Sequence, residues 1–157
     1  MKQALQATVR AGTFEDVPAI AAAVSALVLE LGGSAPERSA AEASTRALIE
    51  DPSLGWVIVA TNGEMLVGVL AASRQTAIHT AGPYALIQDL WVSRDWRSGE
   101  VGSELIDTLI SQVKAMGMAR IEVGLPSERF EAITATESFY RKNEFELLGT
   151  RMRRLIG

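Results

Sequence analysis

The residues best suited to chemistry lie in one short stretch, DWRSGEVGSEL, which spans residues 95–105. This stretch follows an apolar, strand-like segment, opens an amphipathic helical pattern, and contains Arg97 and two glycines. The first amides of a helix lack intrahelical partners, and the helix dipole adds partial positive charge there. Such a loop can therefore hold a phosphate group with its backbone alone. An ordinary strand-to-helix turn explains the same glycines equally well.

The elements around this loop predict a mixed α/β fold. A right-handed strand–helix–strand crossover spans residues 84–125, which makes its two strands parallel neighbours. Asn62-Gly63 predicts a hairpin turn, and Ser39-Ala40-Ala41-Glu42 predicts a capping box at the start of a helix. The expected order is a strand at 8–10, a helix from Thr13 to Leu31, a helix from Ser39 to before Pro52, strands at 55–61, 64–72 and 84–92, a helix from Gly102 to Gly117, a strand at 121–125, a helix at 130–141 and a closing strand pair or hairpin at 145–155.

Composition narrows the possible functions. The 157 residues fit a single domain over 1–157, with 48% hydrophobic residues and a formal net charge of −4. The chain has no cysteine and one histidine, which excludes thiolate and multi-histidine metal sites, so we expect no metal. The negative charge argues against nucleic acid as a partner. Residues 1–6 lack the apolar run of a signal peptide, and no segment is apolar enough to span a membrane, so we expect no membrane association and a cytoplasmic location.

Three short motifs follow one another along the chain: VRAGTFEDV at 9–17, LWVS at 90–93 followed by RSGEVG at 97–102, and SFYRKNEF at 138–145. In this order and spacing they resemble the GNAT superfamily, whose members transfer acetyl from acetyl-CoA to an amine. The second motif is similar to the pyrophosphate signature Arg/Gln-x-x-Gly-x-Gly/Ala, and the third to Phe-Tyr-x-x-x-Gly-Phe. The resemblance implies a mixed, mostly antiparallel central sheet, helices on both faces, and a parallel strand pair splayed at the cofactor cleft.

The resemblance also implies a role for each part of the loop. Acetyl-CoA would be the co-substrate, with its pyrophosphate held at the start of the helix and its pantetheine arm lying along the preceding strand. The pyrophosphate would contact the amides of Ser98, Gly99, Glu100, Val101, Gly102 and Ser103, with Arg97 at the entrance; the pantetheine would contact the main chain of Leu90, Trp91 and Val92.

Two glutamates depart from the family pattern. Glu100 and Glu144 each occupy a position where the resembling motif carries glycine. Two unit charges about 4 Å apart interact by about 1 kcal/mol in water and about 4 kcal/mol near a protein surface. A carboxylate aimed at the pyrophosphate would therefore cancel much of the benefit of the loop. We expect the Glu100 side chain to point to solvent while its amide still contributes.

The transfer needs a proton donor for the departing thiolate and an acceptor for the amine proton. The resemblance assigns the donor role to Tyr140, although Tyr140 and its aromatic neighbours could equally be core residues. Asp89 is our candidate base, because it lies on the cofactor-side strand; Glu122, on the neighbouring strand, or a water is the alternative. The amide of Leu90 or Val92 could hold the thioester oxygen.

The expected activity is acetylation of a primary amine of a small molecule by direct attack in a ternary complex. Glu30, Glu42, Glu128 and Glu131 could attract a cationic amine to the region of the first two helices, although solvated helix faces explain them as well. One alternative is a peptide or protein N-acetyltransferase. Another is a catalytically weak acyl-CoA-binding regulatory module, which the two glutamates favour. We also expect a homodimer, because the resembling folds often pair through a sheet edge or their C-terminal strands.

Overall fold

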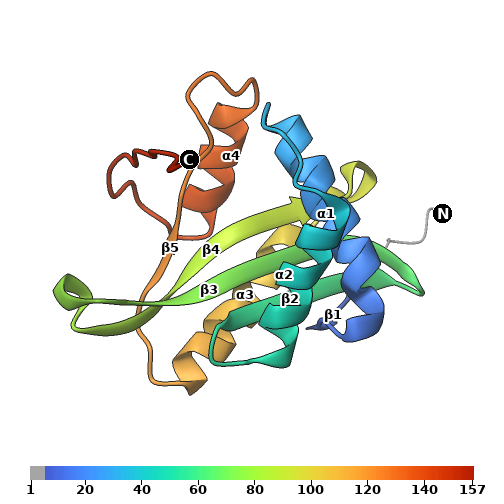
Figure 1. Cartoon of the computed structure of the whole chain (residues 1–157), viewed down its shortest axis with the longest axis horizontal. Helices are drawn as coiled ribbons and strands as arrows, with labels where there is room; N and C mark the ends of the chain where they lie inside the picture. Colours follow the sequence, from blue (N-terminus) through green and yellow to red (C-terminus); the bar gives the residue numbers. More distant parts are fainter. Residues whose placement is uncertain (1–5) are drawn as a thin grey trace.

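A computed structural model describes residues 6–157 as three layers (Figure 1). Helices α1 (Val17–Glu30) and α2 (Arg38–Glu50) cover one face of a central sheet, and α3 (Val101–Ala115) covers the other. Helix α4 (Ile133–Lys142) packs on the α3 side, at the end of the sheet that carries the last strand. Most of the polar stretch at 1–6 lies outside the described residues.

The sheet has five strands in the order β1-β2-β3-β4-β5. Neighbouring strands are antiparallel except β4 and β5, which are parallel and joined through α3. This confirms the mixed, mostly antiparallel fold and the crossover predicted from the sequence. The strand bounds are β1 Thr8–Ala11, β2 Gly55–Asn62, β3 Met65–Ala77, β4 Gly82–Val92 and β5 Ile121–Val123.

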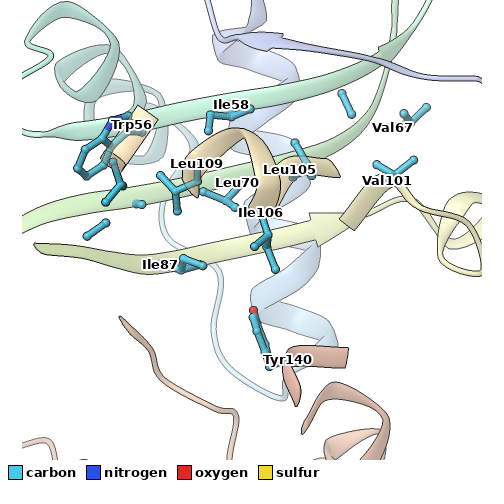
Figure 2. Close-up of a cluster of buried hydrophobic side chains, with 14 of the residues drawn as sticks. Trp56, Ile58, Val67, Leu70, Ile87, Val101, Leu105, Ile106, Leu109 and Tyr140 are labelled. Carbon is cyan, nitrogen blue, oxygen red and sulfur yellow. The ribbon is translucent and has the colours of Figure 1, made fainter. Parts of the chain in front are cut away.

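Two apolar cores, one on each face, hold the layers together. The larger core lies between the sheet and α3 and also contains Tyr140 of α4 (Figure 2). The smaller core joins α1 to the opposite face through Ile20, Val59 and Val69. Alternate residues of a strand point to opposite faces. In β4, accordingly, Leu90 packs against the larger core and Trp91 against the smaller one.

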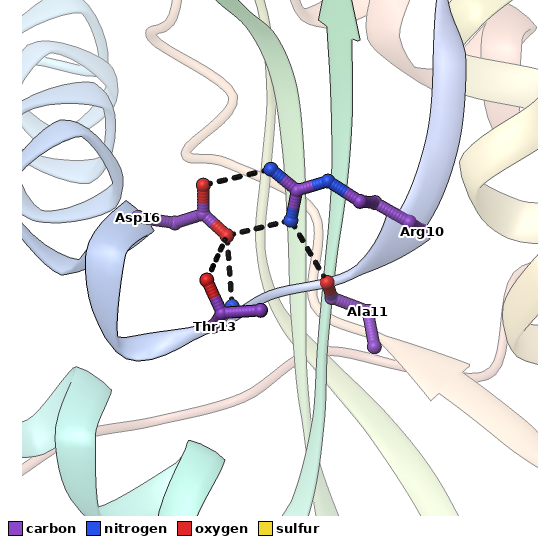
Figure 3. Close-up of polar contacts among 4 residues, drawn as sticks. All are labelled: Arg10, Ala11, Thr13 and Asp16. Carbon is purple, nitrogen blue, oxygen red and sulfur yellow. Dashed lines mark hydrogen bonds and ion pairs between the residues drawn. The ribbon is translucent and has the colours of Figure 1, made fainter. Parts of the chain in front are cut away.

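The turn between β1 and α1 is fixed by a polar cluster (Figure 3). The Asp16 carboxylate accepts hydrogen bonds from the Thr13 amide at 2.8 Å and from both terminal nitrogens of Arg10 at 2.7 and 2.9 Å. These contacts hold the pKa of Asp16 down at about 2. Thr13 is therefore a cap, as predicted, but it caps a short 3₁₀ turn at Phe14–Asp16, and α1 begins one residue later.

Several predicted boundaries are wrong. The capping box at Ser39 does not form, because the Ser39 hydroxyl donates to Glu37 and the helix begins at Arg38. Strand β5 ends at Val123 rather than at residue 125, and α4 begins at Ile133 rather than at residue 130. Strand β3 runs five residues beyond the predicted end, to Ala77.

The closing strand pair predicted at 145–155 is also wrong. Residues 146–157 contain neither helix nor strand. A strand exists only where another edge satisfies its backbone groups, and among residues 6–157 β5 pairs with β4 alone. The segment is exposed throughout and carries several apolar side chains: Leu147, Leu148, Met152, Leu155 and Ile156.

Candidate active site

The parallel strands β4 and β5 separate near the middle of β4. Their pairing covers only Ala85–Ile87 against Ile121–Val123, although β4 continues to Val92. Over residues 88–92, the β4 edge that faces away from β3 therefore has no strand partner among the described residues. At the same point the register with β3 shifts, because Ala71 faces Asp89 while Ala72 faces Ile87. Gln88 is the extra residue of this β-bulge, and such bulges often re-aim side chains beside active sites.

The loop after β4 presents free backbone donors at the start of α3. Among the amides of Ser98 to Ser103, only that of Gly99 has a backbone acceptor in the described chain, the Trp96 carbonyl at 3.3 Å. The N-cap of α3 is Glu100, and no side chain among the described residues caps this end. Five consecutive or nearly consecutive N–H groups are thus left for a ligand, at the positive end of a 15-residue helix.

The side chain of Glu100 does not point into the loop. This side chain is 71% exposed, and its carboxylate lies 3.8 Å from the ammonium group of Lys142 on α4. This confirms the expected solvent orientation. The Lys142 contact was not expected, and at this distance and exposure it is a weak, screened ion pair.

The two loop glycines differ in what surrounds them. A Cβ atom on Gly102 would come within 3.0 Å of two carbons of the Phe139 ring, so glycine lets α4 pack against the first turn of α3. A Cβ on Gly99 would meet only the Trp96 carbonyl oxygen, at 3.6 Å. A side chain at position 102 would thus have to displace the Phe139 ring, whereas a Cβ at position 99 would meet no close neighbour.

The C-terminus of α4 fixes Tyr140 in place. The Phe145 amide donates to the Tyr140 carbonyl and the Glu144 amide to the Arg141 carbonyl, both at 3.0 Å. This is a Schellman motif, which requires a left-handed residue at the position that Glu144 occupies with φ +67°. The Tyr140 ring lies edge-on to the rings of Phe139 and Phe145, with centroids 5.1 and 5.4 Å away.

Tyr140 is buried between α4 and the sheet, and its hydroxyl end points toward the sheet (Figure 2). Burial raises the pKa of this phenol well above its ordinary value of about 10. The phenol is therefore neutral at physiological pH, so it can donate a hydrogen bond or a proton but cannot act as a base.

Asp89 lies half-buried on β4, beside the bulge. Burial raises the pKa of its carboxyl group, and no hydrogen bond from another described residue offsets this effect. By strand alternation its side chain lies on the α1 side with Trp91, whereas Tyr140 belongs to the core on the α3 side. The candidate donor and the candidate base thus flank β4 from opposite faces.

Glu122, the alternative base, has a partner of its own. Its carboxylate accepts a hydrogen bond at 2.6 Å from Arg120, the residue just before β5. Arg97 is likewise engaged, since its guanidinium pairs with Glu30 at the end of α1. Nothing in the sequence pointed to this pair, because the two residues are 67 positions apart.

Other features of the described chain lie away from the point where β4 and β5 separate. A cavity of about 380 Å³ sits at the start of β4, the end opposite the loop, lined by Thr80, Ala81, Gly82, Pro83, Gly117, Met118, Ala119 and Arg120. Within residues 6–157 no cluster of three or more histidine or carboxylate side chains could hold a metal ion. No helix in this part of the chain is long and apolar enough to cross a membrane.

Comparison with known proteins agrees with this geometry. The model of the acetyltransferase (GNAT) family matches residues 23–145. No curated protein shows significant similarity to the chain. Among solved structures, the fold is similar to a transcriptional regulator from Bacillus halodurans (TM-score 0.81, 20% identity, 96% of this chain and 100% of that one).

Two further structures share the fold. One is an aminoglycoside acetyltransferase from an uncultured soil metagenomic sample (TM-score 0.75, 18% identity, 96% of this chain and 97% of that one). The other is a predicted acetyltransferase with acetyl-CoA from Clostridium acetobutylicum (TM-score 0.75, 12% identity, 96% of each chain). The family match covers most of the chain, and the splayed strands and open helix start fit an acetyl-CoA site. The chain belongs to the GNAT family of N-acetyltransferases.

Proposed function

We propose that the protein transfers acetyl from acetyl-CoA to a primary amine of a small molecule, by direct attack in a ternary complex. The observation that carries this proposal is the continuity of two unsatisfied backbone surfaces. The free edge of β4 over 88–92 leads, through a short 3₁₀ turn at Arg94–Trp96, to the free amides between Ser98 and Ser103. The pantetheine arm of acetyl-CoA could pair with the extended strand edge, and the pyrophosphate next to it could bind at the anion site that follows.

In this arrangement the family's acetyl-CoA would supply an activated thioester. The pyrophosphate would be held by the amides of Ser98, Glu100, Val101, Gly102 and Ser103, none of which has a backbone acceptor in the described chain. Gly99 would allow close approach, since a side chain there would project into free space. The main chain of Leu90, Trp91 and Val92 would bind the pantetheine arm, and the amide of Leu90 or Val92 would hold the thioester oxygen.

We assign the proton donor to Tyr140. Its phenol is neutral, faces the sheet and is held between two aromatic rings, so its position varies little. A donor held beside the departing sulfur would stabilise the thiolate as the carbon–sulfur bond breaks. Replacement by phenylalanine keeps the ring packing and removes only the hydroxyl. Full turnover by Tyr140→Phe would contradict this role.

We assign the proton acceptor to Asp89. A raised pKa makes a carboxylate a stronger base, and its place beside the bulge puts it at the separation of the two strands. Its face of the sheet is the one covered by α1, opposite to the core that holds Tyr140. An amine entering from the α1 side would thus lose its proton on one side of β4 while the thiolate gains one on the other.

Two structures with the same fold are named for acetylation of small molecules. They are the aminoglycoside acetyltransferase and a glucosamine-6-phosphate N-acetyltransferase from Arabidopsis thaliana. At 18% and 12% identity they support the fold alone. A panel of amino sugars, polyamines and short peptides, followed by thiol release, would separate small-molecule from peptide acetylation.

The first experiment is a thermal-shift titration with acetyl-CoA. At a ligand concentration about 100 times its Kd, binding stabilises the native state by about 2.7 kcal/mol. For a domain of this size that corresponds to a rise in Tm of about 5–10 °C. No rise at millimolar acetyl-CoA would contradict the proposal, and a rise without acetylation of any amine would favour the acyl-CoA-binding module.

We further propose that two copies associate through the C-terminal segment. Residues 146–157 expose five large apolar side chains, and the outer edge of β5 pairs with no described strand. Exposed apolar segments beside an open strand edge are typical of association surfaces. Light scattering after size exclusion should give twice the chain mass, and Leu148→Glu should shift it toward the monomer. A monomeric wild type would contradict this.

A further inference from the structure

The guanidinium of Arg97 joins three parts of the protein. Its Nη1 and Nη2 donate to the two carboxylate oxygens of Glu30 at 2.5 and 2.8 Å, in a bidentate pair. Its Nε donates to the Val92 carbonyl at 2.8 Å. Glu30 is the last residue of α1 and Val92 is the last residue of β4. One side chain thus ties the end of the helix, the end of the cofactor strand and the start of the loop.

These contacts leave Arg97 poorly suited to bind a phosphate. The two terminal nitrogens of its guanidinium already donate to a carboxylate, and turning them toward the pyrophosphate would break both hydrogen bonds to Glu30. The pair is favourable where it stands, since a cation at the end of α1 also complements the helix dipole. The guanidinium lowers the pKa of Glu30, so the pair is charged at neutral pH.

We propose that Arg97 is a positioning residue rather than a phosphate ligand, and that Glu30 is its required partner. Together they hold the start of the 97–103 loop against α1 and β4, so that the free amides converge on one anion. This inference rests on the proposed binding of acetyl-CoA. It adds Glu30, an acidic residue on a different helix, as a determinant of cofactor affinity.

The sign of the Glu30 effect distinguishes the two roles. If Arg97 were a phosphate ligand, Glu30 would compete with the phosphate, and Glu30→Gln would leave acetyl-CoA binding unchanged or strengthen it. Long-range electrostatics predicts the same direction, because the substitution removes a negative charge near an anion site. If Arg97 positions the loop, Glu30→Gln must instead weaken acetyl-CoA binding, because the Arg97 guanidinium loses its charged partner.

The test measures the Kd of acetyl-CoA by isothermal titration for four variants: Glu30→Gln, Arg97→Lys, the double variant, and Glu104→Gln as the control. Lysine keeps the charge and can still bind a phosphate as a point charge, but it cannot form the bidentate fork. We expect each single variant to raise the Kd about threefold to tenfold. The Kd of the double variant should exceed that of the weaker-binding single variant by less than about twofold, because both changes break the same interaction.

The control carries the same loss of charge in the first turn of α3, where Glu104 forms no ion pair with another described residue. Its Kd should stay the same or fall slightly. Steady-state kinetics with the best amine provides a second readout. The KM for acetyl-CoA should rise with the Kd while kcat stays within about twofold, whereas loss of folded protein would lower kcat alone.

An unchanged or lower Kd for Glu30→Gln would overturn the inference. A Kd for Arg97→Lys equal to that of the wild type would also overturn it. So would a Kd increase in the double variant that equals the product of the increases in the two single variants. A wild type that binds no acetyl-CoA would remove the proposed function itself. The two failures are therefore distinguished by the first titration in the series.

Discussion

Replacing Glu144 with glycine should stabilise the protein. Glu144 has φ +67°, in the left-handed region, because the Schellman motif that ends α4 requires it there. A residue with a Cβ atom adopts this conformation at a cost of about 1–2 kcal/mol, which glycine avoids. Glycine also loses more backbone entropy on folding, which takes back about 0.4–1 kcal/mol. The expected net gain is about 0.5–1 kcal/mol.

The gain can be measured by urea denaturation followed by circular dichroism. The midpoint should rise with no change in the slope, because the surface exposed on unfolding is the same. A thermal scan should show a rise of about 1–4 °C for a domain of this size. The aromatic contacts of Tyr140 should persist, since the same two hydrogen bonds still end the helix.

Glu100→Gly is the matched control. It makes the same substitution at the other position where the family motif carries glycine, but Glu100 has φ −95° and no strain to relieve. Its midpoint should stay the same or fall. The reasoning would be refuted if Glu144→Gly failed to raise the midpoint, or if both variants raised it equally.

Four other substitutions test the remaining contacts. Gly102→Ala should cost about 1 kcal/mol in urea denaturation, because its new methyl group must displace the ring of Phe139, whereas Gly99→Ala should leave stability unchanged and raise the KM for acetyl-CoA. Asp16→Asn should lower the free energy of unfolding by about 1–2 kcal/mol at pH 7. Because the pKa of Asp16 is lowered to about 2, the stabilisation by its carboxylate is present above pH 4 and is lost as the pH falls toward 2. An equal effect of the substitution at pH 7 and at pH 2 would refute this prediction. Asp89→Asn should lower kcat yet raise the urea midpoint at pH 7, because the raised pKa of the buried carboxyl makes its ionised form a cost to the folded state; a lower midpoint would contradict this.

The fold was largely predictable because its signals are local. The sequence Asn62-Gly63 predicted the hairpin of β2 and β3, although the turn itself lies at Gly63-Glu64, and the amphipathic period of α3 likewise identifies one element from its own residues. The crossover rule then makes β4 and β5 parallel without any knowledge of distant contacts. The free amides at 98–103 follow from the same reasoning, since a strand followed by glycines and a helix leaves them without partners.

What the sequence did not reveal depends on distant partners. The Arg97–Glu30 pair and the contact of Gly102 with Phe139 join segments far apart in the chain, and the residue types alone do not predict which residues will meet. The strand pair expected after Phe145 failed for a related reason. An alternating apolar pattern shows which residues could form a strand, but a strand forms only beside an edge that accepts it.

The central claim is that acetyl passes from acetyl-CoA to an amine where β4 and β5 separate. The most direct measurement incubates the protein with isotopically labelled acetyl-CoA and the amine panel, and follows the labelled product by mass spectrometry. We predict that at least one small amine gains one labelled acetyl group for each thiol released. Tyr140→Phe should slow this about a hundredfold without weakening acetyl-CoA binding. Tight binding of acetyl-CoA with no labelled amine or peptide would contradict the account.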